Sequence, residues 1–212
     1  MCKGPFGGYS LSSQSPPHEY ICVQSMDGML SVFEYESFSL SCFLPKVLIP
    51  GPLKYMPKTD SFITVSSSWE LESYRYQVLA SSAKTYERNQ DNTGGVKLKK
   101  ILPEYTYNLG EAAIDIEIIN HQTSSSSQSV CSILILGERN LYCLSDTCVL
   151  KYMKKFDYNP SCFCAYQMLS PNAANSNSIN FIIATHSKLL YVCEDVKVKW
   201  AAQVDQVSYN VN

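Results

Sequence analysis

The closest cysteine pair in the sequence is Cys162 and Cys164, and thiolates are common zinc ligands. A structural zinc site needs a second Cys pair or His residues at ligand spacing, whereas His18, His121 and His186 are scattered along the chain. Alternation along a strand would place both thiols on one face. We therefore interpret the pair as core packing and expect no metal site.

Other residues that could do chemistry lack the partners that chemistry needs. Asp115 and Glu117 would share one face of a strand, but a general acid and base pair would need a further group from elsewhere. The sequence has no Gly-x-Ser-x-Gly segment and no glycine-rich phosphate loop, and Gly94-Gly95 alone is typical of a flexible loop. We expect no enzyme, no catalytic or cofactor-binding residue, and no cofactor or small-molecule substrate.

The remaining candidates are single residues or one short cluster. The three histidines are interpreted as solvated surface groups. Trp69 and Trp200 are expected to pack, with a role at an interface as the alternative. Lys97–Lys100 is the basic cluster of the sequence and is interpreted as a solvated strand edge rather than a phosphate-binding patch.

The composition indicates a globular, β-rich protein. The chain has 212 residues, 45% of them hydrophobic and 17% charged, with 15 Tyr and a net charge of −2, which argues against binding to nucleic acid. The nine cysteines are odd in number and mostly lie in apolar runs, so we expect free thiols in a reducing cytoplasm. The sequence shows no signal-peptide core over Met1–Gln14 and no run long enough to span a membrane.

A hairpin over Tyr20–Tyr35 is the clearest structural signal. Two alternating arms flank Asp27-Gly28, a pair that favours the primed turns of short hairpins. Similar hairpins are predicted around residues 66–68, 137–140 and 185–187. The second of them would have a long strand from Trp69 to Leu79.

The four hairpins recur at a spacing of roughly 40 to 70 residues, close to the period of a four-stranded propeller blade. We predict an all-β β-propeller of four-stranded antiparallel blades without helices, although a β-sandwich of the same strands remains an alternative. The predicted organisation is a flexible lead-in over 1–19 with a short strand near Tyr9–Leu11, a partial propeller over 20–203, and a tail over 204–212. A surface loop insert over 80–100 would lengthen the second unit.

Several segments, taken in order, resemble the N-terminal propeller of the parathyroid-hormone-responsive B1 family, subunits of the Bardet–Biedl syndrome complex (the BBSome). The collinear likeness extends from Phe6 to Gln203 and departs mainly at Tyr9–Pro17, Ala83–Gly95 and Asn172–Asn177. The segments that carry it include Phe6-Gly7-Gly8, Ile21–Leu30, Phe43-Leu44-Pro45, Leu48–Leu53, Thr59–Phe62, Thr64–Ser67, Glu72-Ser73-Tyr74, Leu109–Ala112, Leu136–Asn140, Pro160–Phe163 and Lys199-Trp200-Ala201.

The resemblance implies a seven-bladed ring of which about four blades are present, so that the chain is expected to be a fragment. It also implies a non-enzymatic scaffold in a coat that moves membrane proteins to and from the primary cilium. The implied partners are other BBSome subunits, both propellers and helical-repeat proteins, with peripheral membrane association through the complex. The implied location is the cytoplasm, the cilium and ciliary membrane, and the basal body with its centriolar satellites.

Two other functions stay open at this point. A propeller that binds a phosphoinositide or another ligand would need a basic pocket, and a propeller-type hydrolase would need carboxylates or histidines converging near the axis. The expected inner strands, Phe62–Val65, Ile133–Leu136 and Ile182–Ala184, are apolar. An incomplete ring would leave unpaired strand edges, so we also expect the isolated chain to be poorly soluble or oligomeric.

Overall fold

The computed structural model describes residues 1–7, 19–35, 37–46, 51–90, 101–122, 129–166 and 178–209, with the backbone alone for 84–90, 121–122 and 129–130. The chain divides into two compact units, residues 1–108 and residues 109–212. Each unit is described by itself.

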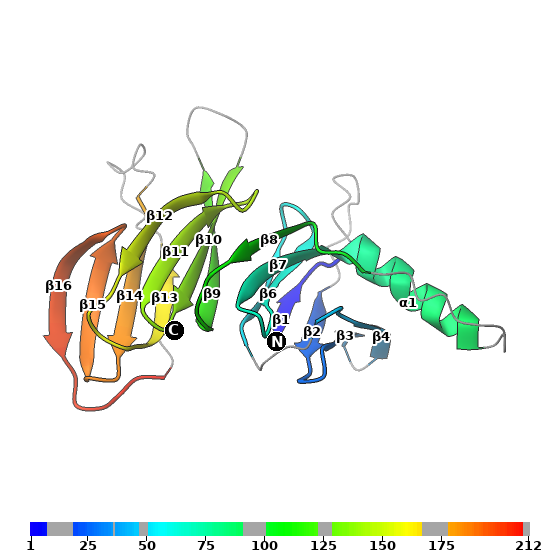
Figure 1. Cartoon of the computed structure of the whole chain (residues 1–212), viewed down its shortest axis with the longest axis horizontal. Coiled ribbons are helices and arrows are strands. Elements are labelled where there is room, and N and C mark those ends of the chain that lie inside the picture. Colours follow the sequence, from blue (N-terminus) through cyan, green and yellow to red (C-terminus); the bar gives the residue numbers. More distant parts are fainter. Residues whose placement is uncertain are drawn as a thin grey trace. The chain divides into compact units, whose positions relative to one another are not determined.

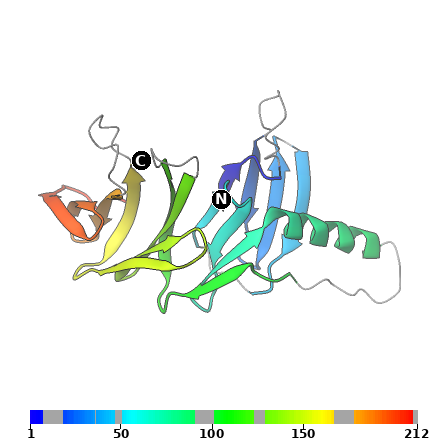
Figure 2. The same cartoon turned by 90° about the horizontal axis from the view of Figure 1, so that it is seen from above.

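The described residues of the N-terminal unit (residues 1–108) form two four-stranded antiparallel sheets and one helix (Figure 1). The first sheet has the order β1 (Cys2–Gly4), β2 (Tyr20–Gln24), β3 (Met29–Glu34) and β4 (Ser37–Phe43). The second has the order β5 (Leu53–Met56), β6 (Ser61–Val65), β7 (Glu70–Arg75) and β8 (Tyr105–Asn108). Helix α1 (Tyr76–Gln90) contacts β4 and β7 (Figure 2).

The C-terminal unit (residues 109–212) also has two such sheets in its described part. One consists of β9 (Ala113–Gln122), β10 (Ser129–Gly137), β11 (Asn140–Ser145) and β12 (Leu150–Lys155). The other consists of β13 (Pro160–Tyr166), β14 (Asn180–Thr185), β15 (Leu189–Glu194) and β16 (Lys197–Gln203). In all four sheets each strand pairs with its neighbour in sequence, which confirms the predicted four-stranded units and excludes Greek-key crossings within them.

Each unit has its own apolar core. In the N-terminal unit, Phe6 packs edge-on against Tyr55 and Phe62, with ring centroids 4.6 and 4.7 Å apart. In the C-terminal unit, Phe156, Phe163 and Phe181 pack with Ile, Leu and Cys side chains of both sheets. Residues 132–136 of β10 are buried on both faces, as their near-continuous apolar run predicts.

One turn design recurs in four hairpins. A Ser or Thr opens the turn, its carbonyl accepts from the backbone N–H three residues later, and that later residue has a positive φ. The pairs are Ser25/Gly28, Ser66/Trp69, Ser145/Cys148 and Thr185/Lys188. The first hairpin therefore closes with a three-residue loop in which Gly28 is left-handed, not with the two-residue primed turn that we expected from Asp27-Gly28.

Helix α1 contradicts three predictions. The propeller was expected to contain no helix. The strand expected to reach Leu79 ends at Arg75, and a helix occupies residues 76–90, where a loop was expected from residue 80. Leu79 and Ala83 are buried in the core, with Tyr76 and Ala80 packed against it. This spacing is that of one helix face, and the alternating interpretation overlooked it. Residues 91–100 of the predicted insert lie outside the described residues.

Two smaller differences concern the first sheet. The predicted lead-in over 1–19 includes strand β1, which pairs with β2, whereas the short strand expected near Tyr9–Leu11 lies outside the described residues. A register shift between Val32 and Phe33 pairs Phe38 with Phe33 and leaves Phe38 exposed. Phe38 therefore lies on the opposite face of β4 from Leu40 and Cys42.

Candidate functional site

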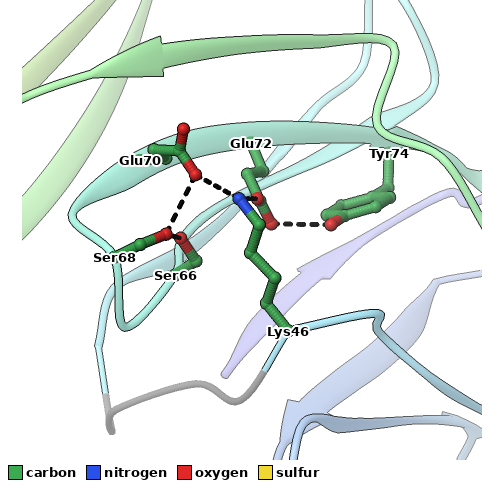
Figure 3. Close-up of polar contacts among 6 residues, drawn as sticks. All are labelled: Lys46, Ser66, Ser68, Glu70, Glu72 and Tyr74. Atoms are coloured by element: carbon green, nitrogen blue, oxygen red, sulfur yellow. Dashed lines mark hydrogen bonds and ion pairs between the residues drawn. The ribbon is translucent and has the colours of Figure 1, made fainter.

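A polar cluster of the N-terminal unit lies beside β7 (Figure 3). Glu70, Glu72 and Tyr74 alternate along this strand, which places their side chains on one face. Ser66 and Ser68 belong to the turn before β7, and Lys46 follows β4 and reaches the same place. The cluster (Lys46, Ser66, Ser68, Glu70, Glu72 and Tyr74) thus joins both sheets of the unit.

Glu72 is the centre of this cluster, and its side chain is only 1% exposed. Its Oε1 lies 2.8 Å from Lys46 Nζ, and its Oε2 accepts a hydrogen bond of 2.6 Å from the Tyr74 hydroxyl. Lys46 also forms an ion pair with Glu70. Both carboxylate oxygens of the buried Glu72 are therefore engaged, as a buried charge requires.

The electrostatics of the cluster keep Lys46 in its charged form. The hydrogen bonds that Lys46 donates to Glu70 and then to Glu72 raise the pKa of Lys46, and the Lys46 ammonium lowers the pKa of Glu70. Burial raises the pKa of Tyr74. Lys46 is therefore a cation and Tyr74 a neutral phenol at neutral pH, whereas a catalytic lysine needs a lowered pKa.

The serines of this cluster face carboxylates instead of a histidine. Ser68 Oγ donates to Glu70 Oε2 at 2.9 Å, and the hydroxyls of Ser66 and Ser68 lie 3.0 Å apart. A nucleophilic serine requires an adjacent base that can take its proton, with a third group orienting that base. The arrangement stabilises the β6–β7 turn and the packing of the two sheets, and it does not form a catalytic triad.

A second polar cluster holds the β10–β11 turn of the C-terminal unit. The Glu111 carboxylate accepts hydrogen bonds from the backbone N–H groups of Arg139 and Asn140 at 2.9 and 3.1 Å. The Asn140 side chain and the Tyr142 hydroxyl donate to Glu111 Oε1 at 2.9 and 3.1 Å. Two segments that carried the family resemblance, Leu109–Ala112 and Leu136–Asn140, therefore meet here, and they do so for a structural purpose.

A third cluster connects the start of the chain to the second sheet. Asp60 Oδ1 accepts from the Gly7 backbone N–H at 3.0 Å and from the Tyr55 hydroxyl at 2.7 Å. Gly7 has a φ of +69°, and a Cβ on it would lie 2.5 Å from the Tyr76 ring. The Phe6-Gly7 segment is thus a packing element as well.

The predicted cysteine pair lies in β13, where Cys162 is opposite Ala184 and Cys164 is opposite Ile182, so both point to one face as expected. The described residues contain no group of three His, Cys, Asp or Glu side chains that could hold a metal ion. All nine cysteines carry free thiols, and six of them are buried.

The other predicted candidates are dispersed. His186 is exposed and its ring lies 6.0 Å from that of Tyr209. His121 belongs to β9, of which only the backbone is described at that position, while Asp115 and Glu117 lie opposite Leu136 and Leu134 in the same sheet. His18 and the Lys97–Lys100 cluster lie outside the described residues.

The two tryptophans were expected to pack, but neither of them is buried. Trp69 is 48% exposed in the β6–β7 turn and Trp200 is 51% exposed on β16. Sequence analysis also missed Lys46 and the burial of Glu72. The signal available for Glu72 was its place between Leu71 and Ser73 in an otherwise buried strand, but no sequence pattern indicated that Lys46 reaches it.

No described helix is both long enough and apolar enough to cross a membrane.

Comparison with known proteins places the chain beside one group of relatives. The family described as PTHB1 N-terminal matches residues 1–212. Protein PTHB1 of Xenopus laevis is 45% identical over 208 residues, which are 97% of this chain and 22% of that protein. Protein PTHB1 of Homo sapiens is 43% identical over 210 residues, which are 98% of this chain and 22% of that protein. The chain thus spans less than a quarter of the length of these relatives.

A likeness to a solved structure shows the fold. The crystal structure of BBS1N in complex with ARL6DN, soaked with lead, has a TM-score of 0.61 at 10% identity. The likeness covers 97% of this chain and 58% of that chain. The four sheets are therefore blades of a β-propeller, as predicted, and the sandwich alternative is excluded.

Proposed function

This chain belongs to the PTHB1 N-terminal family, and we propose that its blades act as a non-enzymatic interaction scaffold within the Bardet–Biedl complex, the BBSome. The observation that carries the proposal is the match of this family to residues 1–212. The PTHB1 and BBS1 names connect the chain to that complex. The role that we propose for the complex is the movement of membrane proteins to and from the primary cilium.

The chemistry of the described clusters supports a scaffold over an enzyme. Glu72, Glu111 and Asp60 are the carboxylates with the most elaborate surroundings, and each holds protein groups in place. Catalytic groups would need perturbed pKa values suited to proton transfer and room for a substrate. The Lys46–Glu72 pair instead satisfies its charges internally.

The likeness to BBS1N adds support at the level of the fold. That protein was crystallised with ARL6DN, so a propeller of this kind presents surfaces to a protein partner. At 10% identity the binding residues do not transfer, because one fold serves many functions. The partners that we propose for this chain are the propeller and helical-repeat subunits of the complex, with membrane association arising through the complex.

The test uses the full-length protein, tagged and expressed in ciliated cells. We expect affinity purification to recover the other BBSome subunits and fluorescence to place the protein in the cytoplasm, the cilium and the basal body. Deleting residues 1–212 should reduce recovery of the subunits. The control is the deletion of an equally long segment elsewhere in the full-length protein. If the tagged full-length protein is recovered without any other BBSome subunit, the proposal is overturned.

A further inference from the structure

We propose that the free edge of β16 binds an extended, acidic segment of a protein partner by strand addition. Strand β16 (Lys197–Gln203) is last in the order β13-β14-β15-β16, and within the described ranges it pairs with β15 alone. Its outer N–H and C=O groups are therefore available to another strand. The inference deepens the proposed scaffold function and rests on it, because it names the partner chemistry.

The exposed apolar side chains on β16 offer contacts on both faces of the sheet. A register shift between Val192 and Cys193 pairs Trp200 with Val192 and Val198 with Cys193, so Trp200 and Val198 point to opposite faces. Trp200 is 51% exposed and Val198 is 46% exposed. An added strand would gain one apolar contact on each face, and an exposed tryptophan is a typical anchor of protein interfaces.

The charge around this edge is positive, although the whole chain has a net charge of −2. Lys197 and Lys199 lie on β16 itself, and Lys154 and Lys155 lie on β12. The ammonium of Lys154 donates to the carbonyl oxygen of Val196, which brings β12 next to the start of β16. Lys154 and the two lysines of β16 therefore lie at one edge of the C-terminal unit.

The two nearby carboxylates are already engaged. Glu194 forms an ion pair with Lys199, which lowers the pKa of Glu194. Asp195 Oδ1 accepts a hydrogen bond of 2.9 Å from the backbone N–H of Ile179. Lys154, Lys197 and Lys199 outnumber these two carboxylates, so the edge keeps a positive excess that an anionic segment can neutralise.

The lysines also select among possible occupants. Lysine on an edge strand opposes pairing with a like-charged strand, so a second copy of β16 is disfavoured. A strand with Asp or Glu opposite the lysines and apolar residues opposite Trp200 and Val198 satisfies both features. The occupant that fits is therefore an extended segment in which acidic and apolar residues alternate.

The test titrates the 212-residue chain with a fluorescent synthetic peptide of about eight residues in which Asp alternates with Val. We expect saturable binding that weakens as salt rises, with slower hydrogen exchange at the amides of 197–203. A peptide with Lys in place of Asp should not bind. The same Asp peptide N-methylated at alternate residues should lose binding, because it cannot complete the ladder.

Three variants locate the site. The double charge reversal Lys197→Glu and Lys199→Glu should weaken binding roughly tenfold or more. The variant Trp200→Ala should weaken binding as well. The double reversal Lys3→Glu and Lys58→Glu, in the N-terminal unit, is the matched control and should have no effect.

The proposal is overturned by an absence of peptide binding, by binding that the β16 variants leave unchanged, or by binding without protection of 197–203. It is also overturned if anionic vesicles containing phosphatidylserine bind β16 while the peptide does not. Any of these results would leave the proposed scaffold function standing, since recovery of BBSome subunits is measured separately.

Discussion

The carboxylate of Glu111 lies where a side chain on residue 137 would have to be. A Cβ added to Gly137 would come within 2.2 Å of Glu111 Oε1. In that position Glu111 accepts hydrogen bonds from the backbone N–H groups of Arg139 and Asn140, which closes the turn between β10 and β11. The absence of a side chain at Gly137 therefore allows a carboxylate 26 residues earlier in the sequence to hold the hairpin.

The first prediction is that Gly137→Ala destabilises the chain by about 1–3 kcal/mol, measured by urea unfolding. The new methyl group displaces the Glu111 carboxylate and breaks its hydrogen bonds to the turn. A double-mutant cycle with Glu111→Ala tests this reason. With that change already present, Gly137→Ala should cost much less, because the clash and the hydrogen bonds are both gone. Equal costs in the two backgrounds would show that Glu111 is not the reason for the glycine.

The second prediction tests whether residues 76–83 are helical. Leu79→Ala should cost about 2–4 kcal/mol, because Leu79 is buried with Ala83 in the core of the N-terminal unit. Val78→Ala is the matched control and should change stability by about 0.5 kcal/mol or less, since Val78 is exposed. A strand would instead bury Val78 together with Tyr76 and Ala80. A larger effect at Val78 than at Leu79 would contradict the helix.

The sequence could predict the hairpins because their signals are local. The arms of Tyr20–Tyr35 alternate in polarity, and the run from Ile133 to Leu136 is too apolar for any exposed face. The prediction of a strand from Trp69 to Leu79 was wrong at its C-terminal end, for a physical reason. Its apolar residues fit both an alternating and a helical spacing over so few positions, and packing of Leu79 against the core decides between them.

The third prediction concerns the left-handed backbone of Trp69, whose φ is +61° at the position that Gly28 occupies in the first hairpin. Trp69→Gly should be more stable than Trp69→Ala by about 1 kcal/mol, because a Cβ is disfavoured in this conformation. Val23, on strand β2, is the control: there Gly should be less stable than Ala by about 0.5–1 kcal/mol. Thermal and urea unfolding of the four variants measure which of Gly and Ala is the more stable at each position. The same order at both positions would contradict a left-handed Trp69.

The polar clusters were harder to predict than the strands, because their members come from distant parts of the sequence. Lys46 and Glu72 lie 26 positions apart, and nothing in either local pattern connects them. The Glu111 cluster had a weak signal, since the Leu-Gly-Glu segment occurs at Leu109 and again at Leu136. Only the fold shows that Glu111 serves the turn of the second segment.

The fourth prediction is that Lys46→Met destabilises the chain by about 1–3 kcal/mol at pH 7, because the buried Glu72 loses its cation. Lys46 lowers the pKa of Glu70, so its stabilising effect is present above the ordinary Glu pKa of 4.5 and is lost as pH falls through the lower folded value. The raised pKa of Lys46 preserves the pair up to at least pH 10.5, its ordinary value, and the effect is lost at higher pH.

The stability difference between wild type and Lys46→Met should therefore be largest between these limits and should shrink in acid, where Glu70 becomes protonated. Urea unfolding at pH 7 and at a pH below 4 measures it. Lys3→Met is the control, since Lys3 and Glu19 form a surface pair at 3.9 Å with mostly exposed side chains, and such pairs contribute little. A difference for Lys46→Met that stays constant from pH 7 into acid would mean that Lys46 acts through packing of its aliphatic chain. The ion pair with the buried Glu72 would then not be what holds Lys46 against β7.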